Sequence, residues 1–228
     1  MTPTPSTPAV VPDAASSATT APPGPRDSQP TTRRRVLEAP DIGRALTRIA
    51  HEILESDRVP AEGDAAGGRP QLVLLGIPTR GVVLAERIGA VIERIEPGAA
   101  AIGALDVTMY RDDLRRQPTR TPQPTRVPGG GIDGATVVLV DDVLFSGRTI
   151  RAALDALNDL GRPRAVRLAV LVDRGHRELP IRPDFVGKNL PSAPGQRVNV
   201  HVSEVDGIDE VAIDDGLDDA QADGGSGA

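Results

Sequence analysis

The sequence contains no cysteine and no tryptophan, and it has only one tyrosine and two phenylalanines. The lack of cysteine excludes disulfide bonds, a cysteine nucleophile and a metal site built on thiolates. Because aromatic residues are so few, the core must be built from Val, Leu, Ile and Ala. Hydrophobic residues make up 39% of the 228 residues, so the chain can still bury the core of one domain.

Long apolar runs are also missing. No run approaches the roughly 18 residues that a membrane span needs, and the N-terminal residues lack the charged and apolar regions of a signal peptide. We therefore expect a soluble, cytoplasmic protein that has no membrane partner.

Composition divides the chain into a body and two tails. Residues 1–34 are rich in Pro, Thr, Ser and Ala and show no hydrophobic period, so they are predicted to be a disordered tail. Residues 214–228 are acidic and rich in glycine, and we expect a second disordered tail there. The body, residues 35–213, is predicted to be one domain. Since residues 204–228 carry nine acidic residues and no basic one, the net charge of −6 leaves room for a basic face on the body that binds a polyanion.

Helical and strand patterns alternate within the body. Asp41 is a candidate N-cap for a helix in which Ile42, Leu46 and Ile49 recur at helical spacing. Strands are expected at residues 71–76, 101–110, 136–140, 166–172 and 198–202, and further helices at residues 82–95 and 148–160. The polar residues 111–134 contain several prolines and glycines and are predicted to form a long flexible loop. This order predicts an α/β fold with a parallel sheet that helices cover on both faces.

The most informative stretch is the run VVLVDDVLFSGRT, residues 137–149. A β-branched strand leads to two adjacent carboxylates, Asp141 and Asp142, and a short turn then leads into a helix. The turn, residues 146–149, offers free backbone N–H groups, hydroxyls and the positive end of a helix dipole, which together favour a phosphate group. Carboxylates close to such a turn suit sugar hydroxyls, or Mg²⁺ held by a polyphosphate. The pattern therefore predicts a ligand that carries both a phosphate and a ribose diol.

This run resembles the phosphoribosyl-diphosphate binding motif of type I phosphoribosyltransferases. Four further segments resemble one subfamily, the bifunctional pyrimidine operon regulators and uracil phosphoribosyltransferases. They are ALTRIAHE at residues 45–52, GIPTRG at 76–81, MYRDDL at 109–114 and LVDRGHRELPIR at 171–182. The resemblance covers roughly residues 36–213. It implies a type I phosphoribosyltransferase fold with a mostly parallel central sheet, helices on both faces and a small hood at about residues 173–190.

The resemblance implies transfer of a phosphoribosyl group from phosphoribosyl diphosphate to uracil, which gives UMP and diphosphate with Mg²⁺ as the cofactor. Mg²⁺ would be held mainly by the diphosphate, with Asp141 and Asp142 as candidate ligands. Arg80 would bind the departing diphosphate as a fixed bidentate cation, and Arg111 begins a candidate lid that excludes water. These four residues are the candidate catalytic residues. The substrate contacts implied by the motifs are Thr79, Arg80, Gly81, Asp141, Asp142, Val143, Leu144, Phe145, Ser146, Gly147, Arg148 and Thr149.

Two positions depart from what other members of the family carry. Many relatives have a basic residue where this chain has Pro78, so one contact to the diphosphate is lost. Purine-using relatives have an acidic residue two positions before the glycine of the phosphate turn, where it faces the base, and here that residue is Phe145. A purine enzyme would lack its expected acid, so Phe145 favours a pyrimidine.

The resemblance also implies binding of pyrimidine-operon mRNA under the control of UMP. The RNA contacts carried over from the family are Thr47, His51, His176, Arg177, Arg182 and Lys188. The residues themselves add Arg48, on the same face of the first helix, and Arg174, in the same basic cluster. Because the patch has no aromatic residues between its charges, binding should rest on contacts from Arg, His and hydroxyl groups and should weaken with salt.

Three functions therefore remain open. The first is an enzyme that also regulates, and the second is an RNA-binding UMP sensor with little or no catalytic activity. Intact Arg80, Asp141 and Asp142 favour the enzyme, because a UMP sensor needs no diphosphate loop. The third is a type I enzyme for another base. A homodimer or a higher homo-oligomer is expected from the family.

Overall fold

The computed structural model describes residues 33–58, 71–111 and 123–215. Residues 1–32 of the predicted N-terminal tail, 112–122 of the predicted loop and 216–228 of the predicted acidic tail lie outside the described residues. Strand β1 begins at Arg33 and strand β8 ends at Asp215, so each strand extends into the tail that the sequence predicts beside it.

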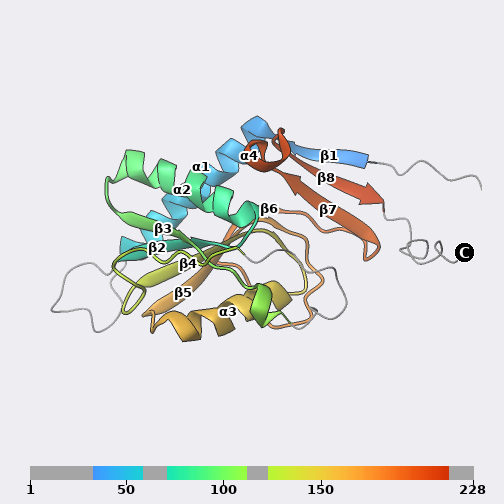
Figure 1. The fold of residues 1–228 in the computed structure, drawn as a ribbon. Helices are drawn as coiled ribbons and strands as arrows, with labels where there is room; N and C mark the ends of the chain where they lie inside the picture. The colour runs from blue at the N-terminus through green and yellow to red at the C-terminus, as the bar shows by residue number, and fades with distance from the viewer. Residues whose placement is uncertain (1–32, 59–70, 112–122, 216–228) are drawn as a thin grey trace, which may run out of the picture. The chain divides into compact units, whose positions relative to one another are not determined.

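The main sheet has five parallel strands in the order β3-β2-β4-β5-β6 (Figure 1). They are β2 (Leu72–Gly76), β3 (Ala100–Ala104), β4 (Thr136–Leu144), β5 (Ala165–Asp173) and β6 (Phe185–Asn189). Every residue of the interior strand β2 is buried, as expected for a parallel strand that is covered on both faces. The predicted α/β class is confirmed.

Helices cover both faces of this sheet (Figure 1). Helices α1 (Ala39–Arg58) and α2 (Arg80–Ile95) pack on one face, and α3 (Arg148–Leu160) packs on the other. Side chains alternate along β2, so Leu74 joins the cluster with α1 and α2 while Leu75 joins the cluster with α3. Apart from Phe185, the buried hydrophobic residues of the described segments are aliphatic or alanine, as the composition predicts. Within the same segments, no helix has the length and hydropathy to cross a membrane.

Several element boundaries differ from those predicted, and three of these differences concern α1, β3 and β4. Helix α1 begins at Ala39, and the Asp41 carboxylate lies in its first turn, where it accepts the N–H of Glu38 at 3.1 Å, as the third residue of a capping box does. The strand predicted at residues 101–110 ends at Ala104, and a short 3₁₀ turn, η1 (Thr108–Tyr110), follows. Strand β4 continues past its predicted end to Leu144, because its pairing with β5 continues beyond the two carboxylates.

A second, three-stranded antiparallel sheet has the order β1-β8-β7 (Figure 1). Its strands are β1 (Arg33–Glu38), β7 (Gln196–His201) and β8 (Glu210–Asp215), and the short helix α4 (Ser203–Asp206) lies between β7 and β8. The strand predicted at residues 198–202 therefore belongs to this sheet and not to the parallel one. The predicted hood at residues 173–190 also needs correction, because β6 lies within it and forms the edge of the main sheet.

The described part of the predicted loop, residues 123–134, is tied to the main sheet. Arg126 and Ala104 exchange two backbone hydrogen bonds of 2.8 and 3.0 Å, and the Ile132 side chain is buried. The loop predicted from residues 111–134 is therefore anchored over its C-terminal half.

Candidate active site

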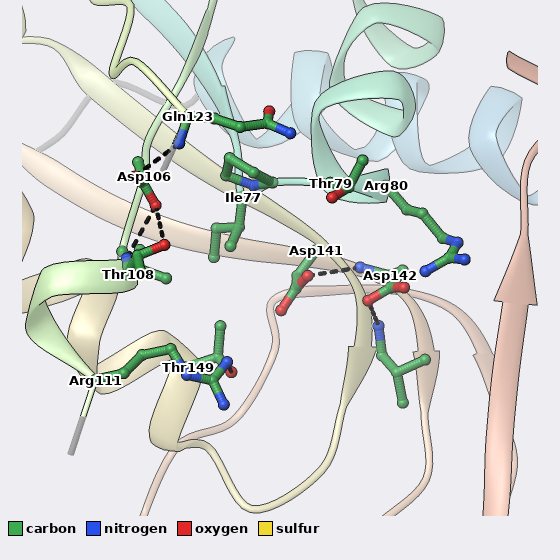
Figure 2. A pocket seen from close by; sticks show the side chains of 13 residues that line it. Ile77, Thr79, Arg80, Asp106, Thr108, Arg111, Gln123, Asp141, Asp142 and Thr149 are labelled. Atoms are coloured by element: carbon green, nitrogen blue, oxygen red, sulfur yellow. Dashed lines mark hydrogen bonds between the residues drawn. The ribbon is translucent and has the colours of Figure 1, made fainter. Parts of the chain in front are cut away.

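A cavity of about 390 Å³ lies where β2, β3 and β4 end (Figure 2). Its walls come from the segments at the carboxyl ends of these strands, with Thr149 from α3 and Gln123 completing them. The neighbouring strands β2 and β4 are followed by helices on opposite faces of the sheet. Such a switch point opens a crevice at the carboxyl ends of the strands, which is where α/β sheets bind ligands.

The two predicted carboxylates, Asp141 and Asp142, both line this cavity (Figure 2). The Asp141 carboxylate accepts the backbone N–H of Asp142 at 2.9 Å, and the Asp142 carboxylate accepts that of Val143 at 2.8 Å. Asp141 is only 8% exposed. Burial and the neighbouring Asp142 charge raise the pKa of Asp141 well above its usual range. The ionised form of Asp141 is therefore costly without a positive charge nearby.

The predicted diphosphate loop, residues 79–81, leads from β2 into α2. Thr79 and Arg80 line the cavity, and the peptide bond between Pro78 and Thr79 is cis. Gly81 is buried, and a Cβ atom there would lie 2.4 Å from the carbonyl oxygen of Val140. Glycine is thus required at this position because the start of α2 packs against the backbone of β4, whereas the family resemblance implies that Gly81 contacts the substrate.

The Arg80 guanidinium is held at one edge by Asp206 of α4. Arg80 Nε donates to Oδ2 at 2.9 Å and Nη2 donates to Oδ1 at 2.7 Å. The hydrogen bonds to Asp206 raise the pKa of Arg80, to which the nearby Asp142 charge also contributes. No sequence pattern indicates this partner, because Arg80 and Asp206 are 126 residues apart.

The phosphate turn, residues 146–149, leads from β4 into α3. Gly147 has a φ of +92°, a left-handed conformation that glycine adopts without steric cost. The carbonyl oxygen of Ser146 accepts the backbone N–H groups of Glu178 and Leu179 at 3.0 and 3.1 Å. Among the described residues of the turn, Thr149 lines the cavity. The segment after β5 therefore supports the turn from outside.

Several substrate contacts expected from the motif lie beside the cavity rather than on its wall. Leu144 is buried, and Phe145 is partly exposed. The Arg148 guanidinium lies 2.6 Å from the Glu178 carboxylate in an exposed ion pair. The motif thus includes residues that shape the turn as well as residues that can face a ligand.

Arg111 reaches the cavity from the end of η1 (Figure 2). Its Nη1 atom lies 3.5 Å from the Thr149 hydroxyl oxygen, and its positive charge opposes the rise in the pKa of Asp141. The structure thus brings Arg111 together with the phosphate turn and the acidic pair.

Three polar wall residues were missed by the sequence analysis: Asp106, Thr108 and Gln123. The Asp106 carboxylate accepts the N–H and hydroxyl of Thr108 at 2.9 and 2.6 Å, and it accepts the N–H of Gln123 at 3.0 Å. Asp106 therefore ties together the two chain segments that flank residues 112–122. A polar residue just after a buried strand is the signal that could have indicated it, but the strand was predicted to continue to Tyr110.

Phe145 contacts two residues from the segment after β5. The Arg174 guanidinium lies over the Phe145 ring at 4.2 Å, and the His176 ring meets the same ring edge-on with centroids 6.3 Å apart. Arg174 is only 7% exposed, and its Nη2 atom donates to the carbonyl oxygen of Gln196 at 2.8 Å. Burial lowers the pKa of Arg174.

Fewer of the predicted RNA contacts are consequently exposed than the sequence suggests. Arg174 is buried, and Arg177 is turned inward, where its guanidinium donates to the carbonyl oxygens of Phe145 and Ile181 at 2.8 and 3.0 Å. Helix α1 packs against β6, and Arg48 Nη2 donates to the carbonyl oxygens of Val186 and Gly187 at 2.9 and 2.7 Å. The predicted RNA contacts that remain exposed are Thr47, Arg48, His51, His176, Arg182 and Lys188.

The oxygen donors of the cavity fit a hard cation only in part. Carboxylate oxygens such as those of Asp141 and Asp142 are suitable ligands for Mg²⁺. Within residues 33–58, 71–111 and 123–215, however, no group of three or more His, Asp or Glu side chains could hold a metal ion. This donor set suits a cation that is coordinated mainly by the oxygens of a bound polyphosphate.

Comparisons with known proteins agree with this fold. The model of the phosphoribosyl transferase domain matches residues 33–205. A relative from Leifsonia xyli subsp. xyli, named Bifunctional protein PyrR, is 70% identical over 188 residues, covering 80% of this chain and 97% of its own. The protein of the same name from Streptomyces coelicolor is 60% identical over 188 residues, covering 82% of this chain and 93% of its own. The solved hypoxanthine phosphoribosyltransferase of Trypanosoma cruzi matches with a TM-score of 0.58 at 16% identity, covering 79% of this chain and 95% of its own.

Proposed function

The chain belongs to the phosphoribosyl transferase domain family, and we propose that it transfers a phosphoribosyl group from phosphoribosyl diphosphate to uracil and also regulates pyrimidine nucleotide biosynthesis. One observation carries the proposal. The acidic pair on β4, the turn that opens α3 and the loop that opens α2 meet at one cavity. The relatives named Bifunctional protein PyrR, at 70% and 60% identity, support uracil as the acceptor and regulation as the second role.

The residues of the cavity have separate roles in the proposed reaction. Asp141 and Asp142 bind the ribose hydroxyls and stabilise the positive charge that develops at the sugar carbon as its bond to the diphosphate oxygen breaks. The N-terminus of α3 and Thr149 hold the 5′-phosphate. Arg80 and Arg111 bind the departing diphosphate. The burial that raises the pKa of Asp141 also strengthens electrostatic interactions. The ionised Asp141 carboxylate therefore attracts a positive charge in the cavity more strongly than an exposed carboxylate would.

Enzymes of this family generally use Mg²⁺ together with phosphoribosyl diphosphate. When bound, Mg²⁺ neutralises charge on the leaving diphosphate. Asp141 and Asp142 are the residues that would contribute protein ligands, while the diphosphate supplies most of the others. Uracil itself has an acidic N–H group and depends little on a dedicated base, which agrees with Phe145 at the position where purine enzymes carry an acid.

The regulatory role rests on the exposed residues of α1, of β6 and of the segment between β5 and β6. We propose that they bind pyrimidine-operon mRNA and that UMP in the cavity controls the affinity. The inward-facing Arg177 supports this link. It donates to the carbonyl oxygen of Phe145 at 2.8 Å, so the segment that carries His176 and Arg182 is joined directly to the loop beside the cavity.

The enzymatic part is tested by measuring UMP formation from uracil and phosphoribosyl diphosphate in the presence of Mg²⁺. Guanine and orotate serve as alternative acceptors, and Asp142→Asn is the matched variant, since it keeps the shape of the side chain and removes its charge. We expect turnover with uracil, little with the other bases, and a loss of at least about tenfold in the variant. Turnover with guanine or orotate in preference to uracil would overturn the choice of acceptor.

A second candidate function is an RNA-binding UMP sensor without significant catalysis. It is favoured by the cost of ionising Asp141, which is buried beside Asp142, and by the ion pair that engages Arg80. Absence of turnover with every base, together with retained UMP binding, would establish this alternative. The presence of Thr79, Arg80 and Gly81 in the proposed diphosphate loop argues for the enzyme, because a UMP sensor needs no such loop.

A further inference from the structure

Two arginines of α2 contact the turn between β7 and β8. Arg80 is the first residue of the helix, and Arg87 lies two turns later on the same face. Arg87 donates to the carboxylates of Glu204 and Asp209, and Arg80 donates to Asp206. The turn is therefore fixed against α2 at two points, and one of them is a residue of the cavity wall.

The pair of Arg80 and Asp206 has the geometry of an orienting contact. Both oxygens of Asp206 are used, at 2.9 and 2.7 Å, and Oδ2 also accepts the backbone N–H of Val202 at 2.9 Å. The side chains of Arg80 and Asp206 are 26% and 15% exposed. The hydrogen bonds from Arg80 lower the pKa of Asp206, so Asp206 stays ionised and its position is held by the backbone of its own turn.

The contact leaves one edge of the guanidinium available. Asp206 engages Nε and Nη2, and within the described residues Arg80 makes no other side-chain hydrogen bond. Figure 2 shows Arg80 at the edge of the cavity next to Asp142, and the Asp142 charge contributes to the raised pKa of Arg80. A guanidinium that is fixed at one edge can present the two N–H groups of Nη1 to an anion without first losing the freedom of a long side chain.

We propose that Asp206 is a positioning residue for Arg80, which it holds in the orientation that binds the diphosphate group of the donor. The inference rests on the proposed function, because it assigns Arg80 to the diphosphate. It also gives the second sheet a role in substrate binding, although Asp206 lies just beyond residues 33–205, which the family model matches.

A simple stabilising role would not account for the arrangement equally well. Partly exposed ion pairs contribute little to stability, and Arg87 already connects α2 to the same turn through Glu204 and Asp209. The additional effect of Asp206 is to fix the orientation of the Arg80 guanidinium at the cavity wall. This difference can be measured.

The test compares the binding of two ligands to Asp206→Asn by calorimetry in the presence of Mg²⁺. Phosphoribosyl diphosphate carries the group that Arg80 binds, whereas UMP lacks it. We expect the variant to bind phosphoribosyl diphosphate about tenfold more weakly, the size expected from the loss of a charge-assisted hydrogen bond, and to bind UMP within about twofold of the original chain. Glu204→Gln is the matched control, because it weakens a neighbouring arginine contact without touching Arg80, and both of its affinities should stay within about twofold.

A double variant establishes that the effect passes through Arg80. In an Arg80→Ala background, Asp206→Asn should cause no further loss of affinity for phosphoribosyl diphosphate. The proposal is overturned if Asp206→Asn lowers the affinity for phosphoribosyl diphosphate as much in the Arg80→Ala background as in the original chain. It is also overturned if the single variant loses as much affinity for UMP as for phosphoribosyl diphosphate, or if its affinity for phosphoribosyl diphosphate is unchanged or higher. Failure of the original chain to bind phosphoribosyl diphosphate would overturn it as well. Because binding is measured without turnover, a chain that shows the expected pattern yet forms no UMP would refute only the proposed enzymatic function.

Discussion

The Asp141 carboxyl group lies in an environment that disfavours its charged form. It is buried beside Asp142, and both burial and the neighbouring charge raise its pKa. The ordinary pKa of an aspartate side chain is 3.8. When folding raises this pKa, the stability of the fold decreases as the pH rises from 3.8 towards the raised pKa. This cost is typical of groups that are kept for function rather than for stability.

Asp141→Asn should therefore stabilise the fold and impair the reaction. The amide oxygen can still accept the N–H of Asp142, while the buried charge is removed. We expect the Tm at pH 7 to rise by a few degrees, the gain to shrink as pH falls towards 4, and UMP formation to fall by at least about tenfold. Thermal unfolding at several pH values checks the first part. A Tm that falls at pH 7 would show that the Asp141 charge is not destabilising.

Phe145 illustrates a contact that no sequence pattern indicates. Its position in the motif favours a pyrimidine, but its stacking with Arg174, at 4.2 Å, depends on the return of the chain after β5. Asp141, Asp142, Arg80 and Thr149 line one cavity, and the sequence indicated them because two motifs, residues 137–149 and 76–81, run through them. Asp206 was missed because its contact with Arg80 joins distant segments, and Asp106 was missed because the strand before it was predicted to continue to Tyr110.

Phe145→Leu should destabilise the protein by about 0.5–1 kcal/mol through loss of the cation–π contact, with a further cost because Arg174 stays buried. Phe145→Tyr keeps the ring and serves as the control. The expected fall in Tm is about 2–4 °C for each kcal/mol in a protein of this size. Equal Tm values for the two variants would show that the stacking contributes nothing measurable.

At the scale of elements, the start of α2 depends on a glycine. Gly81 permits the helix to approach the backbone of β4, since a Cβ atom would lie 2.4 Å from the carbonyl oxygen of Val140. This contact sets the position of Thr79 and Arg80 relative to the acidic pair. The sequence analysis identified the glycine, but it could not distinguish a contact with the protein from one with a ligand.

Gly81→Ala should lower the stability by about 1–3 kcal/mol, as expected when a well-packed site is overfilled. Gly43→Ala on α1 is the matched control, because nothing lies within 4 Å of its added methyl group, and it should raise the stability by about 0.4–1 kcal/mol. Denaturant unfolding of the two variants measures both changes. The packing argument fails if Gly81→Ala is as stable as Gly43→Ala.

The segment between β5 and β6, together with β6 itself, has two kinds of basic residue. Arg177 is joined to the cavity loop and forms an ion pair with Asp173 at 2.7 Å, whereas Lys188 on β6 is exposed. Sequence alone placed both in one RNA patch, because a basic residue gives no sign of whether it faces inward.

Arg177→Ala should weaken UMP binding by about tenfold, because it removes several hydrogen bonds that support the loop, and it should weaken RNA binding as well. Lys188→Ala should weaken RNA binding alone and reduce its dependence on salt. Calorimetry with UMP and filter binding with RNA separate the two effects. Reduced UMP affinity in Lys188→Ala, or unchanged affinity in Arg177→Ala, would contradict this division.

Across the whole molecule, segments from near both ends of the chain meet in the second sheet. Arg33 and Arg35 of β1 form ion pairs with the buried Glu210 of β8. The alternating pattern predicted four of the five strands of the parallel sheet, because each of these four is marked by its own hydrophobic residues, but it missed β6, which lies within the predicted hood. It did not predict the second sheet, since pairing between β1 and β8 joins residues almost at opposite ends of the chain.

A chain that begins at residue 39 lacks β1 and the buried Leu37, whereas a chain that begins at residue 32 keeps both. We expect the shorter chain to have a Tm lower by several degrees, because burial of a leucine alone contributes about 1.5–3 kcal/mol. Equal Tm values would mean that β1 is dispensable for the domain.

The proposed function requires one cavity to serve both catalysis and regulation. The most direct test is the affinity for pyrimidine-operon leader RNA with and without saturating UMP, measured for the original chain and for Asp142→Asn. We predict that UMP tightens RNA binding at least about fivefold in the original chain, and that the variant loses most of this effect because its cavity binds the ribose poorly. Equal RNA affinity with and without UMP, or the same response in the variant, would contradict the claim.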